Sequence, residues 1–324
     1  MSQGSLQSAM MPVVRRVRAY FAPVERERES GAVFDPSRQA GFGLDCPPAP
    51  WVDLGWIDNF ERTSQTMTQT LRAGAQGETA SRFRGLPQAR VEFDFRQWGK
   101  LQMALAAGRE QMNVLASASN ADEQPSGGSA IAAVAVLAGS TANEVICGAG
   151  AVDTFAVGDL VAVDSDYGQQ TGFVGTGIAA AYVNDPADVR RDVDYVRRVT
   201  FNVGRVAEKT ATSLLLAQPL LGGAAQAGMG VQKVMAFLDR DGGAFFQEWS
   251  GLFVLEAESG GRVCFHYPRL SSGGGQESSS DIRKPLTMLA LHGVFDALPA
   301  QDDNDGRTVV CYRSYVPAPQ AAVY

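Results

Sequence analysis

Two histidines and four cysteines are the side chains best suited to metal binding or nucleophilic chemistry in this sequence. His266 and His292 are not at metal-ligand spacing from each other, from a cysteine pair or from an HExxH frame. The cysteines are far apart: Cys46, Cys147, Cys264 and Cys311. Because no CxxC or CxxH pair occurs, reduced thiols are favoured over a zinc site or a disulfide framework. We expect both histidines to be structural.

Motifs for other kinds of catalysis are also missing from the sequence. It has no GxSxG elbow and no GxxxxGK[ST] phosphate loop, and GFVGTG at 172–177 does not match a dinucleotide fingerprint. The acidic run 301–306, QDDNDG, begins with Gln301 where a calcium loop has its first Asp, so a turn is expected. Glu92 and Asp94 fit solvated alternation better than an acid and base pair. We therefore predict a non-enzymatic protein without cofactor or metal.

Composition and charge narrow the classes of partner. The chain has 324 residues, 45% of them hydrophobic, and 28 Lys and Arg against 35 Asp and Glu. This acidic balance argues against a protein whose main task is to grip phosphate backbones. No signal peptide or membrane-spanning run is evident, so a soluble protein made in a cytoplasm is expected.

Residues 86–115 predict a strand, a helix and a second strand in quick succession. Val91, Phe93 and Phe95 alternate with charged residues, which gives a strand with one apolar face. The opposite, water-facing side of this strand carries Arg90, Glu92, Asp94 and Arg96. From Trp98 the apolar spacing becomes helical, through Leu101 and Leu105, and Gly108 ends the helix. We expect this helix to cover the apolar side of the sheet.

A polar segment, 61–85, lies between predicted strands at 51–60 and 90–96; another strand is predicted at 13–21. We interpret 61–85 as a long loop, because it is rich in Thr and Gln, and loops of this length are usually functional. Its arginines outnumber Glu78, so an acidic partner surface is plausible; the alternative is a merely solvated loop. The residues expected to make contacts are Arg62, Met67, Leu71, Arg72, Arg82, Phe83 and Arg84.

The second half of the chain predicts an inserted domain and a return to the first. Residues 117–129 have the composition of a linker, and 141–222 alternate short β-type runs with glycines, as in SH3-like or Tudor-like barrels. A strand from 231, a hairpin of 249–258 with 262–267, and strands at 287–298 and 307–316 follow, with a flexible stretch at 268–280. We therefore predict a flexible N-terminus (1–11), one domain from 12–140 and 223–324, and an inserted barrel at 141–222.

The order of these segments resembles the tail tube (major tail) proteins of long-tailed bacteriophages. The resemblance covers about 12–116 and 228–317 and rests on WVDLGWIDNF (51–60), GLPQARVEFDFRQWGKLQMAL (85–105) and FHYPRLSSGGG (265–275). It implies a mainly β (α+β) fold, a tail-tube-type β-sandwich or barrel with one flanking α-helix. The inserted small all-β barrel would then lie on the outer surface.

The resemblance also implies a function. Hexameric rings would stack into a tube whose joined sheets line a channel for DNA, with loop 61–85 packing on the next ring and the Arg90 to Arg96 face lining the lumen. Expected partners are further copies, the tape measure, terminator and distal tail proteins, and double-stranded DNA in transit, but no membrane. The protein would be assembled in the host cytoplasm and found in the virion tail. We expect a sheet that is incomplete in one chain and completed by neighbouring copies.

Other interpretations remain open from the sequence. Another ring component of the tail, such as a terminator or baseplate hub, would share these features. The inserted barrel could instead bind carbohydrate or a cell-surface ligand through Tyr167, Phe173 and Tyr182. An enzyme whose site is assembled from distant residues is the third alternative.

Overall fold

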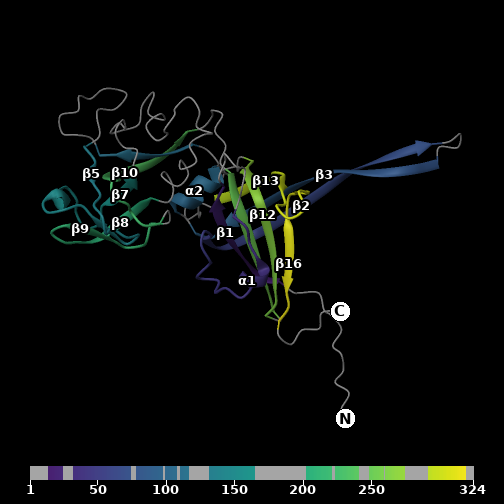
Figure 1. Cartoon of the computed structure of the whole chain (residues 1–324), viewed down its shortest axis with the longest axis horizontal. Helices are drawn as coiled ribbons and strands as arrows, with labels where there is room; N and C mark the ends of the chain where they lie inside the picture. The colour runs from purple at the N-terminus through teal and green to yellow at the C-terminus, as the bar shows by residue number, and fades with distance from the viewer. Residues whose placement is uncertain are drawn as a thin grey trace, which may run out of the picture. The chain divides into compact units, whose positions relative to one another are not determined.

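The chain divides into two compact units in the computed structural model (Figure 1). Unit 1 comprises Met1–Gly108 and Glu248–Tyr324, and unit 2 comprises Arg109–Gln247. The structure describes residues 14–24, 32–73, 78–97, 99–107, 110–116, 131–164, 202–220, 223–240, 248–258, 260–273 and 291–318. Several predicted segments lie outside these ranges, namely 1–11, the linker 117–129, GFVGTG at 172–177, and Trp98, Tyr167, Phe173 and Tyr182.

Unit 1 holds nine strands and two helices within the described ranges. The strands are β1 (Val14–Pro23), β2 (Val52–Ala73), β3 (Glu78–Phe95), β11 (Glu248–Ala257), β12 (Arg262–Ser272), β13 (Leu291–Ala297), β14 (Ala300–Gln301), β15 (Thr308–Val309) and β16 (Tyr312–Val316). The helices are α1 (Pro36–Gln39) and α2 (Lys100–Ala107). The mainly β prediction is confirmed.

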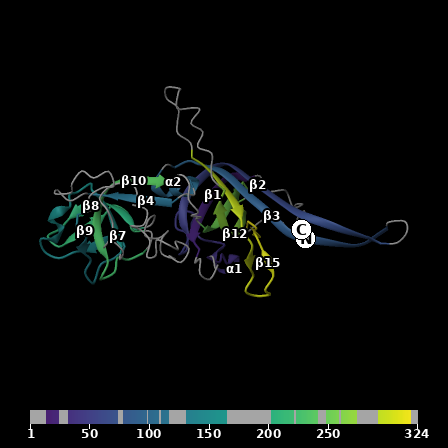
Figure 2. The same cartoon turned by 90° about the horizontal axis from the view of Figure 1, so that it is seen from above.

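Six of these strands close into an antiparallel barrel. Their order is β11-β1-β2-β3-β13-β12, and β12 pairs back with β11 (Figures 1 and 2). β12 pairs with β13 over Leu270–Ser272 and with β16 over Arg262–His266. The predicted hairpin of 249–258 with 262–267 is the β11–β12 pair and is confirmed. The expectation of a sheet left incomplete in one chain is wrong for these strands, because the β11–β12 pairing satisfies both borders internally.

An aromatic cluster fills the barrel, because alternate residues of each strand point inward. Phe93 stacks on Phe295 with ring centroids 5.6 Å apart, and it meets Phe253 edge-on at 5.5 Å. Phe21 lies 5.1 Å from Phe295. Gly293 is needed beside these rings, since a Cβ there would come within 2.8 Å of the Phe295 ring. The apolar face predicted for 90–96 is therefore confirmed as core.

A second core lies outside the barrel, where residues 32–51 cover β1, β11 and β12. Phe34 and Trp51 pack with the outward-facing Tyr20, Leu252 and Cys264. Tyr20 donates its hydroxyl to the Leu44 carbonyl at 2.9 Å. β11 is therefore buried on both faces along most of its length.

A buried arginine ties this covering segment to β1. The Arg18 side chain, which is 9% exposed, binds the exposed Asp45 carboxylate at 2.5 Å and both carboxylate oxygens of Asp53. A buried charge is tolerated only when it is paired in this way. Trp56 lies against the same guanidinium, with its ring centroid 5.0 Å from the Arg18 Cζ.

Helix α2 begins at Lys100 and packs against β12 and β13. Leu105 and Ala106 are buried, and Leu101 is partly buried. The predicted amphipathic helix is therefore present. It does not cover an open apolar sheet face, because that face is enclosed in the barrel.

The prediction of a loop at 61–85 is wrong, because most of this segment belongs to a two-stranded ribbon formed by β2 and β3. β2 and β3 remain in antiparallel register from Gln65↔Gln88 to Ala73↔Glu78, and no other strand pairs with this part of them within the described residues. Both figures show the two strands extending past the rest of the barrel (Figures 1 and 2). Thr66, Thr68 and Thr70 alternate with Met67, Gln69 and Leu71, and Thr favours extended backbone. The loop interpretation gave too little weight to this two-residue period.

Unit 2 is an antiparallel sheet with the order β4-β10-β7-β8-β9-β6, and β5 pairs with β10. Its elements are β4 (Glu110–Leu115), β5 (Val134–Ala135), β6 (Glu144–Ile146), the 3₁₀ helix η1 (Ala151–Thr154), β7 (Leu160–Asp164), β8 (Val203–Lys209), β9 (Ser213–Leu216) and β10 (Gly230–Arg240). Its core includes Val161, Val163, Val206, Leu214 and Val231.

The boundaries of unit 2 differ from the predicted insertion at 141–222. β10 pairs with β4 through Ala236↔Val114 and with β7 through Val231↔Val163, so both flanking strands belong to unit 2. The assignment of the strand from 231 to the first domain is therefore wrong. Its apolar pattern fits either sheet, and the pattern alone carries no information about the pairing partner.

Candidate functional site

The charged face of β3 lies on the outside of the barrel, as the alternation predicts. Arg90 forms a bidentate pair with Asp296, with Nε to Oδ1 at 2.8 Å and Nη2 to Oδ2 at 3.2 Å. Arg96 pairs in the same manner with Asp58, at 2.7 and 2.6 Å. The hydrogen bonds from Arg96 hold the pKa of the Asp58 carboxyl below its usual range. Both arginines are exposed but neutralised by these partners.

Asp94, between these two pairs, is bound from both sides. Its Oδ1 lies 2.7 Å from His292 Nδ1, and its Oδ2 accepts a hydrogen bond from Asn59 Nδ2 at 2.6 Å. Asn59 has a positive φ of 50° at an irregularity of the β2–β3 register, which turns its side chain towards Asp94. His292 therefore has a structural partner. The sequence could not predict this pair, because it joins residues 198 positions apart.

The seven predicted contact residues of segment 61–85 fall into two places. Arg62 lies at the barrel, where its Nε donates to the Tyr267 hydroxyl at 2.8 Å and its guanidinium lies 4.9 Å from the Phe265 ring centroid. The other six are on the ribbon: Met67, Leu71, Arg72, Arg82, Phe83 and Arg84. Arg82 faces Thr70 in the register and is exposed. Arg62 therefore belongs to the barrel, whereas the other six predicted contact residues belong to the ribbon.

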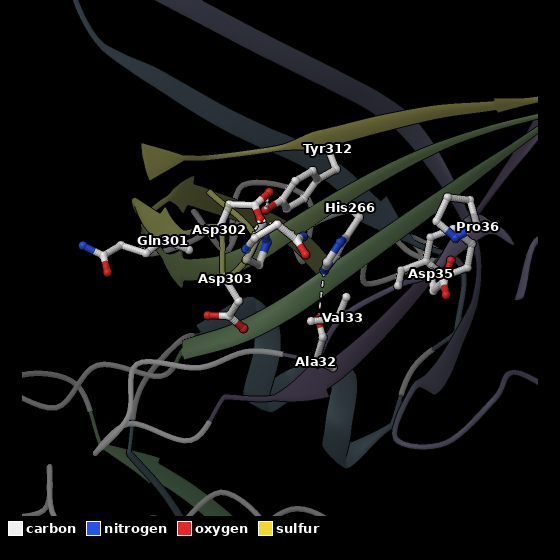
Figure 3. Close-up of a pocket in the computed structure, with 13 residues that line it drawn as sticks. Ala32, Val33, Asp35, Pro36, His266, Gln301, Asp302, Asp303 and Tyr312 are labelled. Atoms are coloured by element: carbon white, nitrogen blue, oxygen red, sulfur yellow. Dashed lines mark hydrogen bonds between the residues drawn. The ribbon is translucent and has the colours of Figure 1, made fainter. Parts of the chain in front are cut away.

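A cavity of about 630 Å³ opens in unit 1, between the segment before α1 and the turn that joins β14 to β15 (Figure 3). We call it the acidic pocket. Its walls are residues 32–36, His266 and Pro268 of β12, residues 300–304, and Tyr312 of β16. Asp35, Asp302 and Asp303 are among the residues that line it.

Tyr312 and His266 form an aromatic wall of the acidic pocket. Their rings are stacked, with centroids 5.6 Å apart and an interplanar angle of 19°. The Tyr312 hydroxyl donates to Asp302 Oδ2 at 2.7 Å, as Figure 3 shows, and the Asn304 backbone N–H donates to Asp302 Oδ1 at 2.9 Å. The QDDNDG turn is thereby fixed against β16, and its prediction as a turn is confirmed.

The acidic pocket is negatively charged at neutral pH. Hydrogen bonds from Asn304 and Tyr312 keep the pKa of Asp302 below its usual range, and those from Ser37 lower the pKa of Asp35. Burial lowers the pKa of His266 to about 4, so its imidazole is neutral. The lining contains three Asp residues and no Lys or Arg, and Asp35 has Arg38 Nε 3.6 Å from its Oδ2. A site of this kind attracts a cation that also has a flat apolar surface.

His266 is structural, as predicted, and its burial should make stability depend on pH. Its Nε2 lies 2.9 Å from the Ala32 carbonyl, and the ring is edge-on to Trp51. Because the folded pKa of about 4 lies below the ordinary 6.5, the unfolded chain takes up a proton more readily than the native one. The free energy of unfolding should therefore fall by about 3 kcal/mol between pH 7 and pH 4.

This contribution can be isolated with His266→Gln, which keeps an N–H donor and does not titrate. Urea unfolding of both proteins at several pH values should show a steeper loss of stability in the native protein below pH 6.5. Parallel curves for the two proteins would contradict the assignment. Carboxyl groups contribute equally to both curves, so only the difference between them reports on His266.

The described ranges contain neither a metal-binding cluster nor a membrane-spanning helix. Within them, no three His, Cys, Asp or Glu side chains gather into a group able to hold a metal ion. No helix there has the length and apolar character needed to cross a bilayer.

The sequence did not predict the acidic pocket, and its acidic segment 301–306 was predicted only as a turn. Asp302 and Asp303 gave the one available signal, but the pocket also needs residues 32–36 and Tyr312, which only the fold brings together. Neither a protein-family model nor a curated protein matches this chain.

Proposed function

We propose that this protein is a structural component of a virion, the repeating unit of a bacteriophage tail tube, and that it works by self-association. In this proposal copies form hexameric rings, rings stack, and the resulting channel conducts double-stranded DNA. Because the barrel closes within one chain, copies join through contacts outside it rather than by completing an open sheet. The tape measure, terminator and distal tail proteins would be further partners.

The ribbon is the observation that carries the proposal. The part from Gln65 to Ala73 is nine residues long, which corresponds to about 30 Å of extended chain. Within the described residues no third strand pairs with this part of β2 and β3, and a two-stranded ribbon is marginally stable by itself. Within the described residues, Thr66, Thr68, Thr70 and Arg82 are all exposed. A polar ribbon of this length is therefore suited to lie on another molecule, and a further copy of the chain is the partner we propose.

The charged face of β3 supports the second part of the proposal, a lumen through which DNA slides. Arg90 and Arg96 are each held by a carboxylate, which reduces their attraction for phosphates. Asp94 adds negative charge to the same face. A surface of paired and acidic groups would guide DNA without retaining it, so we propose that the Arg90 to Arg96 face lines the channel.

Negative-stain electron microscopy of the purified protein tests this proposal. We expect closed rings with an open centre, and stacks of rings at higher protein concentration. Arg90→Gln with Arg96→Gln should leave the rings intact, because both side chains pair within the chain. A monodisperse monomer at every concentration would contradict the proposal.

A further inference from the structure

The acidic pocket and the ribbon have complementary charge. The paired part of the ribbon, Gln65–Ala73 with Glu78–Gln88, contains three arginines, Arg72, Arg82 and Arg84, against one acidic residue, Glu78. The acidic pocket is lined by three carboxyl groups and by a neutral histidine. No residue of the ribbon lines the acidic pocket of its own chain. An arginine that enters this pocket from a ribbon must therefore come from a second molecule.

The shape and chemistry of the acidic pocket suit a guanidinium in particular. Guanidinium is planar, binds carboxylates through paired N–H groups and stacks on aromatic rings. An ammonium group is not planar, so it cannot form the same paired hydrogen bonds or stack on a ring. Tyr312 is 37% exposed and is held in place by its stack on His266. Val33, which is 70% exposed, lines the opening and can contact the aliphatic part of the side chain.

We propose that the acidic pocket is the docking site for the ribbon of a second copy, with Arg82 of that copy lying against the Tyr312 ring and paired with the Asp303 carboxyl group. Asp302, which already accepts the hydrogen bond of the Tyr312 hydroxyl, adds negative charge to the site. This inference rests on the proposed function, because it names the surface that receives the ribbon. The ribbon of one copy and the acidic pocket of the next are different surfaces of the same chain, so the contact between them is head-to-tail. Such a contact generates rings or stacks rather than a two-fold dimer.

A charge exchange tests the pairing. Asp303 is suited to substitution, because within the described residues its side chain makes no hydrogen bond or ion pair and is exposed. Asp303→Arg and Arg82→Asp should each lower the association constant of the full chain about tenfold in sedimentation velocity. The combined variant should recover to within about threefold of the native value, because the opposite charges face each other again.

Two further variants serve as controls. Asp305→Arg makes the same charge change on the same turn but outside the pocket lining, so its effect should be clearly smaller. Arg82→Lys keeps the charge but not the planar group, so it should weaken association less than Arg82→Asp. Thermal unfolding of each variant checks that the barrel is intact.

The outcomes separate this inference from the proposed function. Recovery in the combined variant supports the pocket as the receiving site. If Asp303→Arg associates as strongly as the native protein, while shortening the ribbon still prevents association, the pocket is not the receiving site. Self-association through the ribbon would then still hold. A native protein that does not associate at all overturns both. A loss of association that the combined variant does not recover also overturns the pairing.

Discussion

Shortening the ribbon should abolish self-association while leaving the barrel folded. Gln65 and Gln88 face each other in the β2–β3 register, so replacing residues 66–87 with Asn-Gly joins them through a two-residue hairpin turn. We expect the association constant to fall about 100-fold or more, because the ribbon is the main contact surface in the proposed assembly. Sedimentation velocity of the native and shortened chains over a concentration series measures this change.

The shortened chain should retain its barrel, since β1 pairs with β2 before Asp58 and β13 pairs with β3 from Ala89 onward. Its thermal midpoint should therefore lie within a few degrees of the native value. Thr68→Ser is a matched control, because it keeps the length and polarity of the ribbon and should associate normally. Rings of native size from the shortened chain would remove the ribbon from the assembly.

Phe93→Ala should produce the largest loss of stability of any single substitution considered. The Phe93 ring is fully buried and contacts Phe95, Phe253 and Phe295 at centroid distances of 4.8, 5.5 and 5.6 Å. Truncating such a ring leaves a cavity that the closed barrel cannot easily fill, so we expect a cost of about 3–5 kcal/mol. The urea-induced unfolding transition of unit 1 gives the value.

Glu92→Gln is the control for this substitution, because Glu92 is next to Phe93 on β3 but on the outer face of the barrel. Its effect should stay within about 0.5 kcal/mol. A loss of less than about 1 kcal/mol for Phe93→Ala would show that the aromatic cluster does not hold the barrel together.

The local elements of unit 1 could be predicted because their apolar periods are clear. The alternation of Val91, Phe93 and Phe95 identified both the strand and its buried side, and the 259–261 turn identified the β11–β12 hairpin. The resemblance implied a β-sandwich or barrel, but the apolar pattern alone does not predict closure, because closure depends on which strands pair at the two borders. The same apolar pattern is compatible with an open sheet and with a closed barrel.

The ribbon and the acidic pocket were missed for different physical reasons. The ribbon is rich in Thr and Gln and has few large apolar residues, so its two-residue period is weak, and composition carries no information about its backbone pairing. The acidic pocket is formed by residues far apart in the chain, from Val33 to Tyr312. Neither the hydrophobic period nor a local sequence motif indicates that residues so far apart come into contact.

Hydrogen exchange of the native protein as a function of its concentration tests most directly whether the ribbon binds another copy. If a second molecule covers it, amides in Gln65–Ala73 and Glu78–Gln88 should become more protected as the concentration rises, while β1 and β11 in the barrel should not change. Ribbon exchange that is equally fast at low and high concentration would contradict self-association through this element.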